Sequence, residues 1–189
     1  MVEPLLGTSK TGGLGTFRKP VYKTGLTSVP KFYNWFHTDI RPINKAAKTP
    51  INIEVPIELE MVWTASGWEY DSKGQFFPLD KKGFNKGSSS TFHNYHFTVE
   101  CWKRFIYEGG EKIVFSGDDD TWIYINNQLV IDLGGIHNAM SATYDIDAVA
   151  GLKKGDAYDL SLFHAERHAK GKFFVKFSFC CFTTLQHCV

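Results

Sequence analysis

The sequence predicts an all-β protein, an antiparallel sandwich or barrel made of one domain. Aromatic residues make up 15% of the 189 residues, and phenylalanine alone contributes 16 of them. Aromatic and β-branched residues favour strands over helices. Apolar residues alternate with polar ones in several short segments, and no long stretch has helical periodicity. A chain of this length can bury a sizeable core.

The first strand is predicted at 51–61, where one residue in two is apolar. Such a strand buries one face and exposes the other. Pro56 lies on the polar face and has no backbone N–H, so we expect an edge position or a bulge there. The apolar positions are Ile51, Ile53, Val55, Ile57, Leu59 and Met61.

Further apolar segments predict strands at 95–102, 112–115, 121–125, 128–132, 158–163 and 173–179. Asn126 and Asn127 separate two of them and predict a tight hairpin, because asparagine tolerates positive φ. The last two strands are expected to pair with each other across a loop at 164–172.

Charge and hydropathy restrict the classes of partner. The formal net charge is +1, so no field of one sign attracts nucleic acid or anionic lipid. No apolar run approaches the roughly 20 residues that span a bilayer, and the N-terminus lacks the pattern of a signal peptide. Residues 1–16 read as a flexible arm, 17–189 as the single domain, and the chain as part of a larger protein.

The cysteines are Cys101, Cys180, Cys181 and Cys188, and their spacing matches no zinc pattern. Cys101 and Cys181 lie on the apolar faces of their strands, so we predict that they pair, and that Cys180 pairs with Cys188. A bond between the adjacent cysteines would be strained. Free thiols in a reducing cell are the alternative.

Three consecutive carboxylates, Asp118, Asp119 and Asp120, precede a predicted strand. Adjacent carboxylates repel one another, and a hard cation relieves this repulsion. Calcium prefers six to eight oxygen ligands. The alternative is a solvated acidic turn.

A second motif contains Gly134, Gly135 and His137 directly after a predicted strand. Paired glycines let the backbone approach a ligand closely, so a binding loop is one interpretation and an ordinary loop is the other.

A third motif contains Glu166, Arg167 and His168. Glu166 could coordinate calcium, and Arg167 could pair with Asp120 or Asp132. A structural ion pair between Glu166 and Arg167 is the alternative.

Zinc and catalytic interpretations are weaker. His137, His164 and His168 could bind zinc together with an aspartate, but their spacing at a strand end does not place the rings on one helical face. No nucleophile motif is present, and adjacent carboxylates cannot flank a glycosidic bond. We therefore expect a non-enzyme without catalytic residues.

Several motifs together resemble the fibro-slime domain of the PA14 superfamily, which is named after the anthrax protective antigen. They follow the family's order from about residue 17 to 180. The segments that carry the resemblance are 32–36, 76–80, 83–84, 93–98, 115–137 and 162–168.

The resemblance implies a two-sheet antiparallel β-sandwich with jelly-roll-like character in a secreted or cell-surface protein. Sugar-binding relatives, including yeast flocculins and epithelial adhesins, hold calcium with two consecutive aspartates joined by a cis peptide. The ion then bridges to vicinal hydroxyls of a sugar. For this chain the resemblance implies calcium-dependent binding of glycans or small saccharides in cell adhesion, or a structural or protein-interaction module that calcium rigidifies.

Matched onto this sequence, the family's aspartate pair is Asp118 and Asp119, and the resemblance implies a cis bond between them. The further metal ligands come from the loop that contains Glu166 and His168. Yeast relatives have an asparagine in this loop and this chain has none, so Glu166 is the expected substitute. The expected sugar-binding residues are Asp118, Asp119, Gly134, Gly135, His137, Arg167 and His168.

Overall fold

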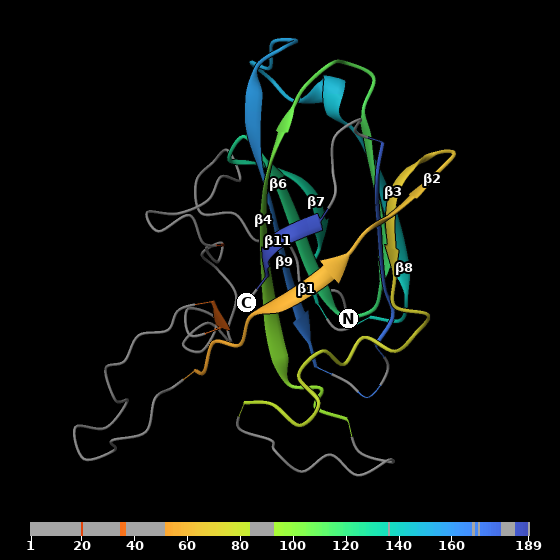
Figure 1. Cartoon of the computed structure of the whole chain (residues 1–189), viewed down its shortest axis with the longest axis vertical. Coiled ribbons are helices and arrows are strands. Elements are labelled where there is room, and N and C mark those ends of the chain that lie inside the picture. Colours follow the sequence, from red (N-terminus) through yellow and green to blue (C-terminus); the bar gives the residue numbers. More distant parts are fainter. Residues whose placement is uncertain are drawn as a thin grey trace, which may run out of the picture.

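The computed structural model describes residues 20, 35–36, 52–83, 93–135, 137–167, 169, 171–178 and, for the backbone alone, 184–188. Within these residues the chain is all-β, as predicted, apart from a 3₁₀ residue at Trp35 and the short 3₁₀ helix η2 (Ile146–Ala148) (Figure 1). No helix in these residues is long and apolar enough to cross a bilayer.

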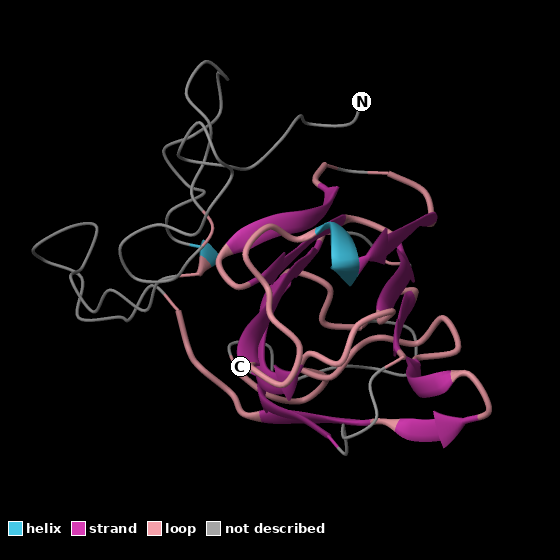
Figure 2. Cartoon of the chain, turned by 90° about the horizontal axis from the view of Figure 1, so that it is seen from above, coloured by secondary structure: helices cyan, strands magenta, loops and turns pink. Residues whose placement is uncertain are grey.

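Two antiparallel sheets form the sandwich in the described residues. The five-stranded sheet has the order β2 (Val62–Thr64), β3 (Gly67–Asp71), β10 (Phe173–Phe177), β5 (Lys112–Gly117) and β8 (Met140–Asp145). The four-stranded sheet has the order β4 (Phe97–Ile106), β9 (Ala157–Glu166), β6 (Asp120–Ile125) and β7 (Gln128–Leu133). A separate pair joins β1 (Ile57–Glu60) to β11 (Thr184–Cys188). Figure 2 views the sandwich from the end that carries η2.

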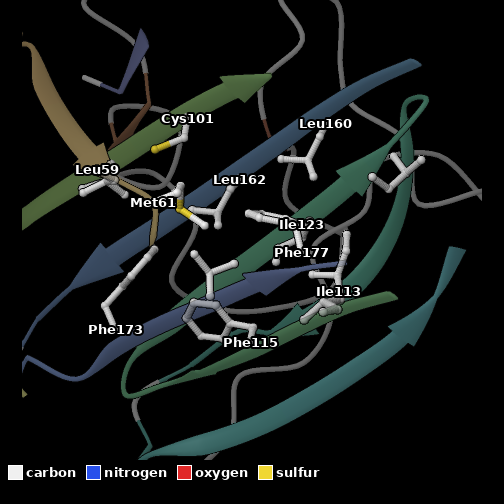
Figure 3. Close-up of a cluster of buried hydrophobic side chains, with 14 of the residues drawn as sticks. Leu59, Met61, Cys101, Ile113, Phe115, Ile123, Leu160, Leu162, Phe173 and Phe177 are labelled. Atoms are coloured by element: carbon white, nitrogen blue, oxygen red, sulfur yellow. The ribbon is translucent and has the colours of Figure 1, made fainter. Parts of the chain in front are cut away.

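The main core lies between the two sheets and is built by alternation along each strand. In β10, Phe173, Val175 and Phe177 are buried and the residues between them are partly exposed. From the opposite sheet, Ile123 and Leu162 meet them (Figure 3). The strand pattern predicted for Phe173 to Phe177 is confirmed.

β6 breaks this alternation, because all six of its residues are buried. Trp122 and Tyr124 point to the outer face, where they form a second cluster with Phe163 and Phe36. The four-stranded sheet is therefore covered on both faces at its centre.

The predicted asparagine hairpin is confirmed. Asn126 and Asn127 have φ values of 47° and 64° and join β6 to β7. Two positive φ values match the twist of the flanking strands. The first predicted strand is shorter than expected, since β1 begins only at Ile57, after Pro56. It pairs with β11 alone and has a register shift between Ile57 and Leu59.

The predicted pairing of the last two strands is wrong. β9 lies between β4 and β6, while β10 lies between β3 and β5 in the other sheet. The residues that join them cross from one sheet to the other. Neighbours in sequence usually pair, but a sandwich with crossing connections separates them.

Cys101 is fully buried on the core side of β4, and its sulfur belongs to a disulfide. Cys180 and Cys181 lie outside the described residues, and the side chain of Cys188 is not described. The two predicted pairings therefore stay predictions.

Candidate functional site

The topology gathers four sheet-crossing connections at one end of the sandwich, which we call the crossing end. Each connection leaves a strand of one sheet and enters a strand of the other. The register fixes their position, because Asp120 lies opposite Ala165 and Gly117 opposite Phe173. The connections are 72–96, 118–119, 134–139 and 167–172. All three polar motifs of the sequence therefore meet here.

The aspartate run contains the shortest of these connections. Asp118 and Asp119 alone link β5 to β6, and Asp119 adopts a left-handed conformation with φ of 57°. Aspartate is among the few side chains that tolerate this region. The cis bond expected between the two aspartates is wrong, because no cis peptide occurs in the described part of the chain. Here the left-handed residue makes the sharp turn between the sheets.

Both aspartates hold the loop that follows β9. The backbone N–H of Lys172 donates to Asp118 Oδ1 at 2.7 Å. The backbone N–H of Arg167 donates to Asp119 Oδ2 at 2.9 Å. Each carboxylate thus uses one oxygen to fix one end of the 167–172 connection, which places that loop beside the aspartate pair.

Asp120 fills a different role. Its Oδ1 accepts from the backbone N–H of Gly135 at 2.6 Å, and its Oδ2 lies 2.7 Å from Arg167 Nη2. Burial raises the pKa of Asp120, and the Arg167 charge opposes this effect. Of the partners considered for Arg167, the structure therefore forms the ion pair with Asp120.

The backbone of the glycine motif holds Asp132 as well as Asp120. The N–H of Gly134 and the Trp122 indole N–H both donate to Asp132 Oδ1, at 3.1 and 3.0 Å. A Cβ at Gly134 would lie 3.0 Å from the indole nitrogen, so a side chain there would crowd the contact. The indole of Trp122 is buried in the outer aromatic cluster and does not form a sugar platform.

His137 contributes its backbone more than its ring. Its carbonyl accepts from the N–H of Asp119 at 3.4 Å. Its ring nitrogens lie 2.9 Å from the Asn138 carbonyl and 3.1 Å from the Leu133 carbonyl. The imidazole is therefore engaged by nearby backbone carbonyls.

Glu166 and His164 lie on the core side of β9. His164 is fully buried, its Nδ1 lies 2.9 Å from Thr121 Oγ1, and its Nε2 lies 3.9 Å from Glu166 Oε2. Burial lowers the pKa of His164 to about 4, so the ring is neutral at physiological pH. Edges of the Phe76 and Phe173 rings surround it.

The buried charge at the crossing end is mostly negative. Four carboxylates are buried there, those of Asp118, Asp119, Asp120 and Glu166. Arg167 supplies an opposing charge through its ion pair, and His164 supplies none. Buried charges are costly unless they are paired or bind a metal ion.

The oxygen donors suit calcium chemically, but side chains alone do not complete a site. Asp118 and Asp119 each use one carboxylate oxygen for the loop. No group of three potential side-chain ligands is assembled in the part of the chain that the structure describes. Backbone carbonyls, water or sugar hydroxyls would have to supply the remaining oxygens. His168, an expected ligand, lies outside the described residues.

Two structural contributions escaped sequence reasoning. The backbone N–H of Lys172 fixes the loop to Asp118. Nearly every residue has a backbone N–H, so the sequence does not indicate which one will donate. Trp35 lies under Arg167, whose guanidinium carbon is 5.1 Å from the ring centroid. These two residues are 132 positions apart, so no local pattern in the sequence indicates their contact.

The comparisons with known proteins agree with this architecture. The sequence matches the PA14 domain family over residues 80–179, which is more than half of the chain. The chain belongs to the PA14 domain family. The resemblance to fibro-slime and PA14 proteins is thereby confirmed.

Its relatives include proteins of Dictyostelium discoideum. Protein psiH is 34% identical over 186 residues, covering 89% of this chain and 25% of psiH. Protein psiC is 36% identical over 179 residues, covering 89% of this chain and 33% of psiC. The chain thus spans about a quarter to a third of the length of these relatives.

Among solved structures, a β-glucosidase from Kluyveromyces marxianus matches 46% of this chain and 11% of its own chain. The TM-score is 0.34 and the identity 18%.

Proposed function

We propose that this chain is a calcium-dependent carbohydrate-binding module of a secreted or cell-surface adhesion protein. It would act without catalysis, and its partners would be cell-surface glycans or small saccharides. Membership of the PA14 family supports this proposal, since sugar-binding modules belong to the superfamily that the sequence resembles.

The observation that carries the proposal is the buried negative charge at the crossing end. Asp118 and Asp119 lie in a two-residue link between the sheets and are 8% and 1% exposed. Each carboxylate accepts a backbone N–H from the 167–172 connection. A bound calcium ion would compensate this charge and offer open coordination positions to vicinal sugar hydroxyls.

The loops around the aspartate pair would shape the sugar site. The backbone N–H of Gly135 donates to Asp120 and that of Gly134 to Asp132, and the 167–172 connection is fixed to Asp118 and Asp119. Shallow sugar sites bind weakly, often near millimolar, which corresponds to about 4 kcal/mol. Several copies on a surface would add avidity.

Glycan-array binding with and without a chelator tests the proposal. We expect binding to selected sugars in calcium and its loss in chelator. Asp119→Asn should abolish binding, because it removes one of the two anionic ligands. Asp147→Asn, at the opposite end of the sandwich, is the matched control and should bind as the wild type does. Wild-type binding that persists in chelator, or no binding to any sugar, would contradict the proposal.

A second function follows from the same charges. Calcium could rigidify the crossing loops of a structural or protein-interaction module that binds no sugar. The burial of all four carboxylates favours a role of this kind, because burial limits their contact with a ligand. Calcium would then raise the melting temperature while every sugar on the array stays unbound.

A further inference from the structure

A short segment near the N-terminus covers the outer face of the four-stranded sheet. We call residues 35–36 the strap. The Phe36 ring meets Trp122 at 6.2 Å and Phe163 at 5.3 Å, both nearly edge-on at 87° and 80°. The Thr98 hydroxyl donates to the carbonyl of Trp35 at 2.7 Å. The strap is therefore bound to β4, β6 and β9, although it lies far from them in sequence.

Trp35 extends this cover to the candidate site. The guanidinium carbon of Arg167 lies 5.1 Å from the Trp35 ring centroid, and the same guanidinium pairs with Asp120 at 2.7 Å. Asp120 is held in turn by the N–H of Gly135. A cation over a tryptophan face is attracted by the ring quadrupole, most strongly where water is excluded. The Arg167 side chain is only 21% exposed, so this condition is met.

The Arg167 guanidinium is held in place by its contacts with the Trp35 ring and with Asp120. Its Nε is buried and has no hydrogen-bond partner among the described residues. A long side chain loses conformational entropy when it is fixed, and so it needs compensating contacts to stay in one conformation. The backbone N–H of Arg167 holds Asp119. The position of Arg167 therefore affects both Asp119 and Asp120.

We propose that Trp35 is a positioning residue, which holds Arg167 against Asp120 and so keeps the crossing-end loop in place over Asp119. The functional unit then includes the strap and begins before the family match at 80–179. The ring contact itself stands without the proposed function, and only its effect on calcium affinity rests on that function.

The test uses the full chain with Trp35→Ala, Trp35→Phe and Phe36→Ala. Arg167→Lys identifies the Arg167 Nε–H resonance by its absence. We expect Trp35→Ala to shift this resonance and to speed its hydrogen exchange about tenfold, since the ring no longer covers the guanidinium. Trp35→Phe should largely restore the wild-type signal. Phe36→Ala is the matched control, because it removes strap packing and lowers the melting temperature while it leaves the resonance in place.

Calcium affinity, measured by calorimetry, gives the second readout. Trp35→Ala should weaken calcium binding about threefold or more, and Trp35→Phe should stay within about twofold of the wild type. An Arg167 resonance that is unchanged in Trp35→Ala, or that moves equally in Phe36→Ala, would overturn the inference. If the wild type binds no calcium, the proposed function fails, while the Arg167 resonance still decides the role of Trp35. If Trp35→Ala does not fold, Trp35→Leu replaces it, because leucine fills part of the space but has no aromatic face, and the same shift of the Arg167 resonance is expected.

Discussion

Both ends of the sandwich carry acidic residues, but their surroundings differ. At the crossing end, Asp119 and Asp120 are each 1% exposed. At the opposite end, which carries η2 (Figure 1), the carboxylates of Glu111 and Asp147 each accept two hydrogen bonds from nearby groups. Glu111 accepts from the N–H groups of Glu108 and Gly109 at 2.5 and 2.8 Å.

Asp147 follows the same pattern at that opposite end. It accepts from the N–H of Gly110 at 2.7 Å and from the hydroxyl of Tyr107 at 2.8 Å. The Gly110 donor is the main cause that lowers the pKa of Asp147, whereas burial raises the pKa of Asp120. Acidic residues alone therefore do not identify a cation site. The crossing end differs because four carboxylates are buried there together, whereas at the η2 end Glu111 is buried and Asp147 is exposed.

The largest expected effect comes from removing the buried positive charge. Arg167→Met leaves Asp120 buried without its ion-pair partner, which should cost about 3 kcal/mol of unfolding free energy. The matched change is Lys112→Met, whose pair with Asp145 is 3.5 Å long and about half exposed. That change should cost less than about 0.5 kcal/mol. Urea unfolding of both variants measures the difference, and equal losses would remove the distinction between the two ends.

Replacing one carboxylate by an amide should change the stability of the fold in opposite directions at the two ends. Glu111→Gln places an amide N–H₂ against a backbone N–H donor and should destabilise the fold by about 2 kcal/mol. Asp119→Asn keeps an oxygen for the N–H of Arg167 and removes one buried negative charge. In chelator this variant should be as stable as the wild type or more stable. Thermal unfolding in chelator measures both, and a marked loss of stability in Asp119→Asn would show that its charge is already compensated.

The smallest effect is a pH dependence confined to the η2 end. The hydrogen bond to Asp147 raises the pKa of Tyr107 from 10.0 to about 12. The folded state therefore favours the protonated phenol. The stability that Tyr107 contributes is full below pH 10 and is lost as the pH rises to about 12. The difference in unfolding free energy between wild type and Tyr107→Phe should shrink over this range. A constant difference would contradict the raised pKa of Tyr107 and its cause, the hydrogen bond to Asp147.

The sequence predicted most of what local patterns encode. Alternation located the buried face of β10, and two asparagines located the β6–β7 turn, because each depends on residues close in sequence. The pairing of β9 with β10 failed because nothing local records a change of sheet. The three polar motifs lie together because they belong to connections that cross between the sheets, so local patterns do not record their proximity either.

The candidate site was predicted in composition more than in conformation. Asp118 and Asp119 were chosen from their charge and order, whereas the left-handed Asp119 was missed in favour of a cis bond. A turn of two residues between sheets admits more than one backbone solution, and residue type does not select among them. The contact of Trp35 with Arg167 joins distant segments and needs the folded chain to be seen.

Thermal unfolding with and without calcium is the decisive test for a calcium site at the crossing end. Calcium at about a thousand times its dissociation constant should stabilise the wild type by about 4 kcal/mol, which raises its melting temperature by about 10 °C. Asp147→Asn should keep this increase, and Asp119→Asn should lose most of it. A wild-type melting temperature that does not change with calcium would contradict a calcium site at the crossing end. So would an increase in Asp119→Asn as large as in the wild type.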